Sequence, residues 1–137
     1  MIKISNNLTV LLIEDNELLQ KIYAIMLKNL GYNVHMAGNS EEAAIFFDKD
    51  IAAIITDIGL PGGKSGIDIA KDFRCFEKTN KTGRIPIIAI TAYTDAEVHK
   101  KGMKAGINEI ATKPVTQDHL KIMLKQWITW SQRKTKV

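Results

Sequence analysis

The chain has 137 residues, of which 45% are apolar and 25% are charged, and its formal net charge is +4. This length and composition suit one globular domain, and the longest apolar runs are far shorter than the roughly 20 residues of a membrane span. The first residues show no basic region followed by an apolar core, so we expect no secretion signal and a cytoplasmic location. We expect an N-terminal extension at residues 1–8, the domain at 9–131 and a basic tail at 132–137.

Short apolar runs rich in β-branched residues alternate with longer segments of helical period. The predicted strands are residues 8–13, 33–37, 51–56, 85–91 and 108–112. The predicted helices are residues 16–30, 41–47, 66–77, 96–105 and 116 onward. The alternation predicts an α/β fold in which helices cover both faces of a parallel sheet. The third and fourth strands are almost wholly apolar, which predicts that they lie in the middle of the sheet.

The predicted helices have recognisable ends. Ser40 and Asp95 are expected N-caps of the second and fourth helices, and Gly31 ends the first. The single cysteine, Cys75, falls within the third helix, where we predict a small buried or half-buried side chain.

Positive charges gather at the end of the chain. Lys125, Arg133, Lys134 and Lys136 all lie within the last thirteen residues. A frayed, solvated tail explains such residues more simply than a nucleic-acid surface does, so we expect no direct binding to nucleic acid. Two tryptophans on the last predicted helix, Trp127 and Trp130, suggest one ring packed on the sheet and one exposed for a partner.

Polar side chains follow the predicted strands. Glu14 and Asp15 come after the first strand, Asp57 after the third, Thr91 at the end of the fourth and Lys113 after the fifth. Ligands of open parallel sheets bind at the carboxyl ends of the strands, so we expect these side chains to converge there. Taken singly, each has a plainer role as a turn residue, a helix start or a loop residue.

The expected cluster has the chemistry of phosphoryl transfer. Three carboxylates held together repel one another unless a cation compensates, and ligation by oxygen alone favours Mg2+ or Mn2+ over zinc. Phosphoryl transfer needs an in-line nucleophile, a metal, and a cation or hydroxyl for the remaining charge. Asp57, the metal, Lys113 and Thr91 meet these needs.

The motifs together resemble those of the receiver domain of two-component response regulators. They are Leu-Leu-Ile-Glu-Asp-Asn (11–16), Ile-Ile-Thr-Asp-Ile-Gly-Leu-Pro (54–61), Ile-Pro-Ile-Ile-Ala-Ile-Thr-Ala (85–92) and Thr-Lys-Pro (112–114). The resemblance covers residues 9–130 and implies a doubly wound, flavodoxin-like (βα)5 fold with a five-stranded parallel sheet in the order 2-1-3-4-5.

The resemblance also implies a role for each site residue. Asp57 would be the phosphorylated residue, Asp15 a direct Mg2+ ligand, and Glu14 a ligand of metal-bound water. Gly59 would offer its backbone carbonyl to the metal. The phosphoryl oxygens would bind Thr91 in the active state and Lys113. The donor would be a phosphohistidine on a histidine kinase or a histidine phosphotransfer domain, and the chain would catalyse its own phosphorylation and dephosphorylation.

Two features depart from the usual pattern. Ile110 stands where many receivers have an aromatic residue that swings inward with the threonine, so we expect no aromatic switch. Tyr93 is a candidate to shield the phosphoryl group from water instead. The loop after Asp57, residues 59–66, is one residue longer than usual and contains adjacent glycines, Gly62 and Gly63.

Several functional settings stay open. The chain is either a stand-alone regulator or a receiver of a hybrid sensor kinase, and its motifs favour the second. A homodimer through the fourth helix, fifth strand and fifth helix is possible. A haloacid-dehalogenase-like phosphatase would need an Asp-x-Asp pattern after residues 8–13, which is absent. A degenerate receiver that binds partners without being phosphorylated is the remaining alternative.

Overall fold

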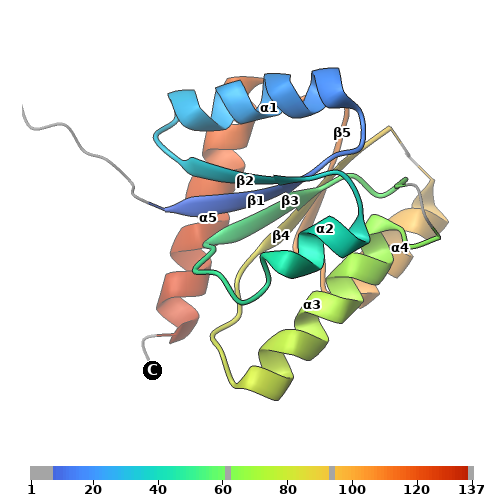
Figure 1. The fold of residues 1–137 in the computed structure, drawn as a ribbon, viewed down its shortest axis with the longest axis vertical. Helices are drawn as coiled ribbons and strands as arrows, with labels where there is room; N and C mark the ends of the chain where they lie inside the picture. The colour runs from blue at the N-terminus through green and yellow to red at the C-terminus, as the bar shows by residue number, and fades with distance from the viewer. Residues whose placement is uncertain (1–7, 61–62, 93–94, 136–137) are drawn as a thin grey trace, which may run out of the picture.

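The structure is a computed structural model that describes residues 8–60, 63–92 and 95–135. Within these residues, strands and helices alternate along the chain (Figure 1): β1 (Thr9–Ile13), α1 (Glu17–Asn29), β2 (Asn33–Ala37), α2 (Ser40–Ile45), β3 (Ala53–Thr56), α3 (Gly66–Asn80), β4 (Ile87–Thr91), α4 (Ala96–Lys104), β5 (Glu109–Thr112) and α5 (Gln117–Thr135). All neighbouring strands pair in parallel, and their order is β2-β1-β3-β4-β5. The predicted fold class and strand order are confirmed.

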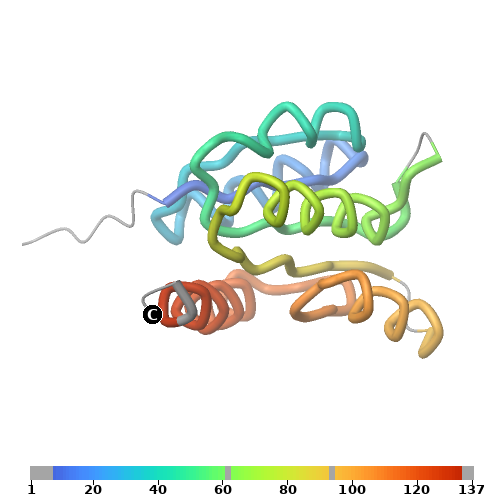
Figure 2. Tube along the Cα trace, turned by 90° about the horizontal axis from the view of Figure 1, so that it is seen from below, coloured from blue at the N-terminus to red at the C-terminus, as the bar shows by residue number. Residues whose placement is uncertain are grey.

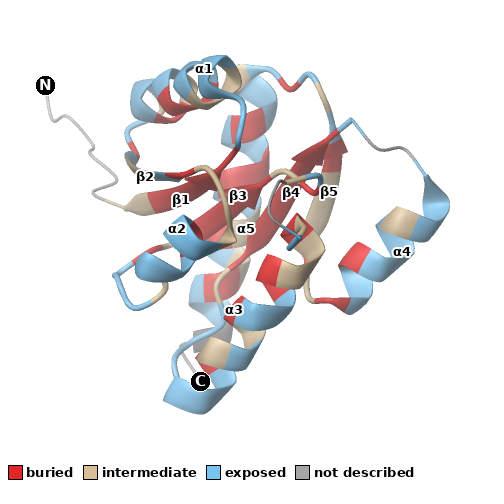
Figure 3. Ribbon diagram, turned by 45° about the vertical axis from the view of Figure 1, so that its right-hand side comes forward, coloured by how far each residue is buried: buried red, intermediate tan, exposed pale blue. Residues whose placement is uncertain are grey.

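Each face of the sheet carries its own apolar core, because successive strand residues point to opposite faces. On one face, Val10 and Leu12 of β1 join a buried cluster with Leu120 of α5. On the other, Leu11 joins a cluster with Phe73 of α3. The strands are therefore buried between helices whose outward sides are exposed (Figure 3). A central sheet covered on both faces leaves its strand ends as the place for polar chemistry.

Side-chain caps begin most of the helices, with one difference from the prediction. Asp95 caps α4 as predicted, and its carboxylate accepts a hydrogen bond from the N–H of Glu97 at 2.8 Å. The N-cap of α2 is Asn39, whose side chain accepts from the N–H of Glu42 at 2.9 Å, while Ser40 is the first helical residue. Asn and Ser are equally good N-caps, so the residue type alone does not decide which of the two is the cap. The extended backbone of Asn39 shows that it is the cap and that the helix begins at Ser40.

The end of the chain is more ordered than predicted. Helix α5 continues to Thr135, so residues 132–135 are helical and Lys125 and Arg133 lie on a helix.

Cys75 is exposed and not buried, because the helical period of α3 turns Phe73 toward the core and Cys75 away from it. Neither tryptophan is fully exposed. Both are half-buried, and their rings meet edge-on at a centroid distance of 5.5 Å.

The amino ends of β4 and β5 are tied to α3 by one side chain. The guanidinium of Arg74 donates to the carbonyl of Ile85 at 2.7 Å, to the carbonyl of Gly106 at 2.8 Å and to the side chain of Asn108 at 2.9 Å. It also pairs with the carboxylate of Glu77 at 2.8 Å. Burial lowers the pKa of Arg74, while Glu77 raises it.

In the part of the chain that the structure describes, no helix is long and apolar enough to cross a membrane.

Candidate phosphoacceptor site

The predicted carboxylates meet at the carboxyl edge of the sheet. In the pairing of β1 with β3, Ile13 lies opposite Thr56, so the residues that follow the two strands are neighbours. The N–H of Asp57 donates to the carbonyl of Ile13 at 3.0 Å and extends the pairing by one residue. Carboxylate oxygens of Glu14, Asp15 and Asp57 lie within 4.8 Å of one another.

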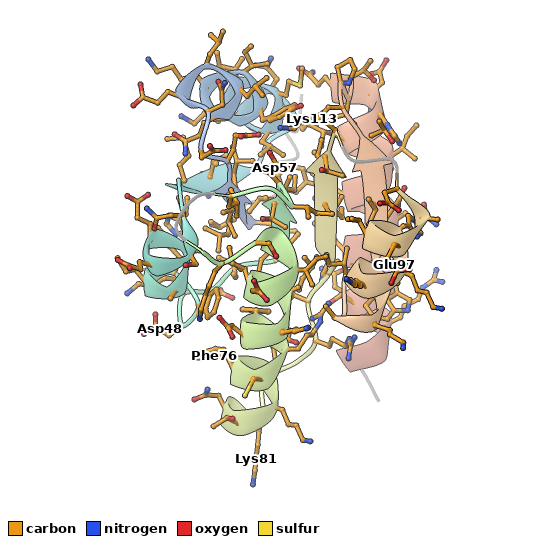
Figure 4. All side chains as sticks on the ribbon, turned by 90° about the vertical axis from the view of Figure 1, so that its right-hand side faces the viewer. Asp48, Asp57, Phe76, Lys81, Glu97 and Lys113 are labelled. Carbon is orange, nitrogen blue, oxygen red and sulfur yellow. The ribbon has the colours of Figure 1, made fainter. Side chains whose placement is uncertain are left out.

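Lys113 joins this cluster from the end of β5 (Figure 4). Its Nζ lies 2.9 Å from Oε1 of Glu14 and 2.9 Å from Oδ2 of Asp57. The three side chains are largely enclosed, with 18%, 3% and 12% of their surface exposed for Lys113, Glu14 and Asp57. Burial lowers the pKa of Lys113, but the hydrogen bonds and charges of Asp57 and Glu14 outweigh it, so the pKa is raised.

The carboxylate of Asp57 has a defined orientation. Its Oδ1 accepts hydrogen bonds from the N–H of Ile58 at 2.7 Å and of Gly59 at 3.3 Å. Its Oδ2 faces Lys113. The two oxygens therefore have different partners, and the carboxylate is held between backbone N–H groups and an ammonium.

The buried carboxylate of Glu14 is held in the same way. Its Oε2 accepts a hydrogen bond from the N–H of Asn16 at 3.1 Å, and the side chain of Asn16 caps α1. Gln20 of α1 donates from Nε2 to the backbone carbonyls of Glu14 at 3.1 Å and Ala37 at 3.3 Å. Sequence reasoning missed Gln20, because nothing in its position on an amphipathic helix distinguishes it from a surface residue.

Thr91 lies at the same edge, at the end of β4. It is fully buried at 0% exposure, and its backbone carbonyl accepts from the N–H of Lys113 at 2.8 Å. The next residue, Ala92, is exposed. Tyr93, the predicted shield, lies outside the described residues, as does Gly62 of the loop after Asp57. Gly63 of that loop is described and has a positive φ of 86°.

The donor atoms at this edge fit a hard divalent cation. Three carboxylates and one ammonium leave an excess of negative charge in a confined space. Such crowding is relieved when a cation binds, and ligand sets made of oxygen alone suit Mg2+. Asp15 is exposed, so it is accessible to a metal from solvent.

Comparison with known proteins identifies the family. Residues 10–125 match the family model of the response regulator receiver domain. The chain belongs to the response regulator receiver domain family. It is 28% identical over 123 residues to the peroxide stress-activated histidine kinase mak2 of Schizosaccharomyces pombe, covering 86% of this chain and 5% of that one.

Two solved receiver domains are similar in both sequence and structure. The receiver domain of sensor histidine kinase PA1611 from Pseudomonas aeruginosa, with magnesium coordinated in its active site cleft, is 30% identical with a TM-score of 0.79. The match covers 90% of this chain and 98% of that one. The co-crystal structure of the Saccharomyces cerevisiae histidine phosphotransfer protein Ypd1 with the receiver domain of Ssk1 is 30% identical with a TM-score of 0.82. It covers 93% of this chain and 92% of that one. The chain spans between 5% and 30% of the length of the first curated relatives that it matches.

In this receiver domain, Ile110 packs against α4. A Cβ added to Gly102 would lie only 2.9 Å from Cδ1 of Ile110, so the isoleucine fills the space that the glycine leaves. Ile110 is half-buried and packs against the core cluster that includes Phe73 and Ile107.

Two further residues of the site were missed by sequence reasoning. A Cβ added to Gly66 would lie 2.1 Å from the backbone oxygen of Asp57, so the start of α3 packs directly on the backbone of Asp57. Tyr23 of α1 is 4% exposed. Burial raises its pKa, the charge of Lys113 lowers it, and the charges of Glu14 and Asp57 raise it further. Tyr23 stands among the apolar residues of α1, and Gly66 ends a glycine-rich loop, so neither position differs in sequence from its neighbours.

Proposed function

We propose that Asp57 accepts a phosphoryl group from a phosphohistidine in a Mg2+-dependent reaction and that the modified domain signals through protein contacts. The observation that carries this proposal is the shared ion pair, in which Lys113 lies 2.9 Å from both Asp57 and Glu14 beside Asp15. Asp15, Asp57 and the carbonyl of Gly59 would hold the metal, and Glu14 would hold its water. Bound Mg2+ neutralises charge on the carboxylates and on the phosphoryl oxygens.

Asp57, Lys113 and Thr91 would each have a separate role in the transfer of the phosphoryl group. A carboxylate oxygen of Asp57 forms a bond to phosphorus as the bond between phosphorus and the histidine nitrogen breaks, and the imidazole leaves. Transfer turns the Asp57 carboxylate into an acyl phosphate, so the ammonium of Lys113 then pairs with a phosphoryl oxygen. Thr91, buried at the end of β4, would donate its hydroxyl to another phosphoryl oxygen. Attack of water on phosphorus returns Asp57 and releases phosphate, and both reactions are catalysed by the domain itself.

Helix α1 offers a contact surface for the donor of the phosphoryl group. Leu18, Ile22 and Ile25 form an apolar stripe on its outer side, with exposed fractions of 68%, 38% and 59%. The stripe begins three residues after Asp15 and suits a helix-on-helix contact. A histidine kinase or a histidine phosphotransfer domain would pack one of its own helices on this stripe and present its histidine from that helix. Such a contact fits a receiver that belongs to a hybrid sensor kinase or a phosphorelay.

Intact mass measurement tests the phosphoacceptor. Incubation with Mg2+ and acetyl phosphate should add about 80 Da to the protein, the mass of one phosphoryl group in an acyl phosphate. Asp57→Asn should abolish the gain, and Asp48→Asn, an exposed aspartate on another loop, should not. No gain with acetyl phosphate or with a phosphorylated histidine phosphotransfer protein would refute the proposal and favour a receiver that binds partners without phosphorylation.

Thermal unfolding tests the metal site. Mg2+ should raise the melting temperature of the protein by mass action, and Asp15→Asn should remove most of that increase. Asp118→Asn, on the exposed side of α5, serves as the matched control. An unchanged response to Mg2+ in Asp15→Asn would show that the ion binds elsewhere.

Phosphotransfer kinetics test the α1 surface. Leu18→Glu and Ile25→Glu should slow transfer from a phosphorylated histidine phosphotransfer protein and leave phosphorylation by acetyl phosphate unchanged. Met103→Glu on α4, another exposed apolar residue at 44% exposure, should affect neither reaction. Equal loss with both donors would locate the defect in the site and not in docking.

Three statements about the whole protein remain proposals. We propose a cytoplasmic location, a domain that occupies residues 9–131, and a homodimer through α4, β5 and α5. Sedimentation of the protein with and without acetyl phosphate tests the dimer, and an unchanged monomer in both conditions would exclude it.

A further inference from the structure

Five exposed cations lie on the end of α3, on the loop that follows it and on α5, and Asp48 and Asp50 line a neighbouring hollow with Thr82 and Ser131. The five cations are Lys78, Lys81, Arg84, Lys125 and Arg133. We call these five residues the basic end. Figure 4 shows Lys81 at the far end of α3 from Asp57 and Lys113.

The two parts of the basic end are joined. The hydroxyl of Ser131 on α5 donates a hydrogen bond to the carbonyl of Arg84 at 2.7 Å. The ribbon of Figure 1 and the tube of Figure 2 both show the end of α5 beside the loop between α3 and β4. The segment that carries Arg84 therefore lies against the part of α5 that carries Arg133.

The surface is hollowed next to both groups of cations. A hollow of about 460 Å3 is lined by residues of α3 and the following loop: Arg74, Glu77, Lys78, Lys81, Thr82 and Arg84. A shallow groove of about 520 Å3 runs along the outer side of α5 and is lined by Ile122, Lys125, Gln126, Thr129, Trp130 and Arg133. Glu77 is the one carboxylate among these lining residues, and both of its oxygens are engaged, by Arg74 and by the N–H of Ile85.

The groove on α5 also has an apolar floor. Ile122 is 63% exposed although the neighbouring Met123 and Leu124 are buried in the core. Trp130 lies eight residues further along the same side of the helix, half-buried, with its ring packed edge-on against Trp127. Positively charged side chains therefore flank an apolar strip.

We propose that the basic end is a docking surface for an acidic segment of a partner protein, which places an apolar side chain over Ile122 and Trp130 and carboxylates against the surrounding cations. A compact free anion fits less well, because the five cations are exposed and spread over two elements. Nucleic acid fits less well, because phosphodiester contacts would leave Ile122 and Trp130 without an apolar partner.

A second copy of the chain is also a poor occupant. A two-fold contact places the same patch of both copies face to face, so it would bring five cations against five. Charge complementarity therefore selects an acidic partner. The surface lies at the opposite end from Asp57, so a partner can bind it whether or not Asp57 is phosphorylated. A partner bound here leaves the phosphoacceptor edge accessible.

Fluorescence anisotropy tests the proposal with a labelled peptide of about 14 residues that forms an amphipathic helix of glutamate and leucine. The triple variant Lys81→Glu, Arg84→Glu and Arg133→Glu should weaken binding at least about tenfold, since three attractions become repulsions. The control variant Lys100→Glu, Lys101→Glu and Lys104→Glu changes net charge equally on exposed positions of α4 and should weaken binding less than about twofold. Ile122→Ser, which changes no charge, should also weaken binding.

Several outcomes would overturn the proposal. If both triple variants weakened peptide binding equally, binding would depend on the net charge of the protein and not on the basic end. A DNA duplex that binds more tightly than the peptide at equal salt, and is lost in the same triple variant, would make the basic end a nucleic-acid surface. A dimer in sedimentation that dissociates in that variant would make it a contact between copies. The corresponding Gln variants check that folding is intact, and unchanged phosphorylation by acetyl phosphate separates the result from the phosphoacceptor function.

Discussion

Substitution of Gly66 by alanine should disturb the phosphoacceptor directly. The added Cβ would lie 2.1 Å from the backbone oxygen of Asp57 and 3.0 Å from the Cα of Ile58. The first distance is about 1 Å short of an ordinary contact, and the obstructing atoms are backbone atoms that cannot rotate away. Forcing such a contact typically costs about 1–3 kcal/mol of folding stability, even though alanine favours the helix.

The same displacement should reach the chemistry. A shift of the Asp57 backbone moves its carboxylate away from Lys113, which lies 2.9 Å from it. A misplacement of about 1 Å can slow a reaction on the order of a hundredfold. We expect Gly66→Ala to lower the free energy of unfolding in urea by about 2 kcal/mol and to slow phosphorylation by acetyl phosphate at least about tenfold.

Gly38→Ala is the matched control, because its Cβ would meet the end of the flexible Glu42 side chain at 3.3 Å and the backbone oxygen of Glu14 at an ordinary contact distance of 4.0 Å. A Gly66→Ala protein with unchanged stability and unchanged phosphorylation rate would refute the reasoning. A protein that loses stability but is phosphorylated at the normal rate would show that the loop absorbs the displacement without moving the carboxylate.

Two further predictions concern groups outside the cluster of acids. Burial raises the pKa of Tyr23 above 10.0, so its contribution to stability is complete below pH 10.0 and is lost as pH rises through the folded-state pKa. Tyr23→Phe should therefore retain more of its neutral-pH stability above pH 10.0 than the natural protein does, and identical pH dependence in urea unfolding would contradict this. Arg74→Ala should lower the free energy of unfolding by about 3–5 kcal/mol, because it leaves the buried carboxylate of Glu77 without its cation. Arg74→Lys should recover only part of that loss, and a loss below about 1 kcal/mol would mean that the network adds little to stability.

The features that could be predicted from the sequence are those set by local patterns. The alternation of apolar runs and helical segments was enough to predict the sheet and its helices. The polar residues after the strands were enough to predict the cluster around Asp57. Boundaries were less accurate. Ile51 and Ile85 were predicted in strands, yet β3 begins at Ala53 and β4 at Ile87, because an apolar side chain can enter the core before its backbone joins the sheet.

The features that could not be predicted depend on contacts between distant segments. The approach of Gly66 to Asp57 requires the path of the loop between them, and the partners of Arg74 include residues 32 and 34 positions away. The burial of Tyr23 follows from the packing of α1 on the sheet. Helical order through residue 135 comes from packing of α5, in which Ser131 bonds to Arg84, whereas composition alone favoured a solvated tail.

The contacts of Arg74 have a consequence for how a change at Asp57 would spread. They fix α3, the start of β4 and the turn before β5 to one another at the edge away from the site. With that edge held, we expect any rearrangement after phosphorylation to be a rotation about it, with small displacements near Gly106 and larger ones toward the beginning of α4. A spin label near Asp95 should then report a larger movement than one near Lys104, and the ratio of the two would measure how firmly the edge is held.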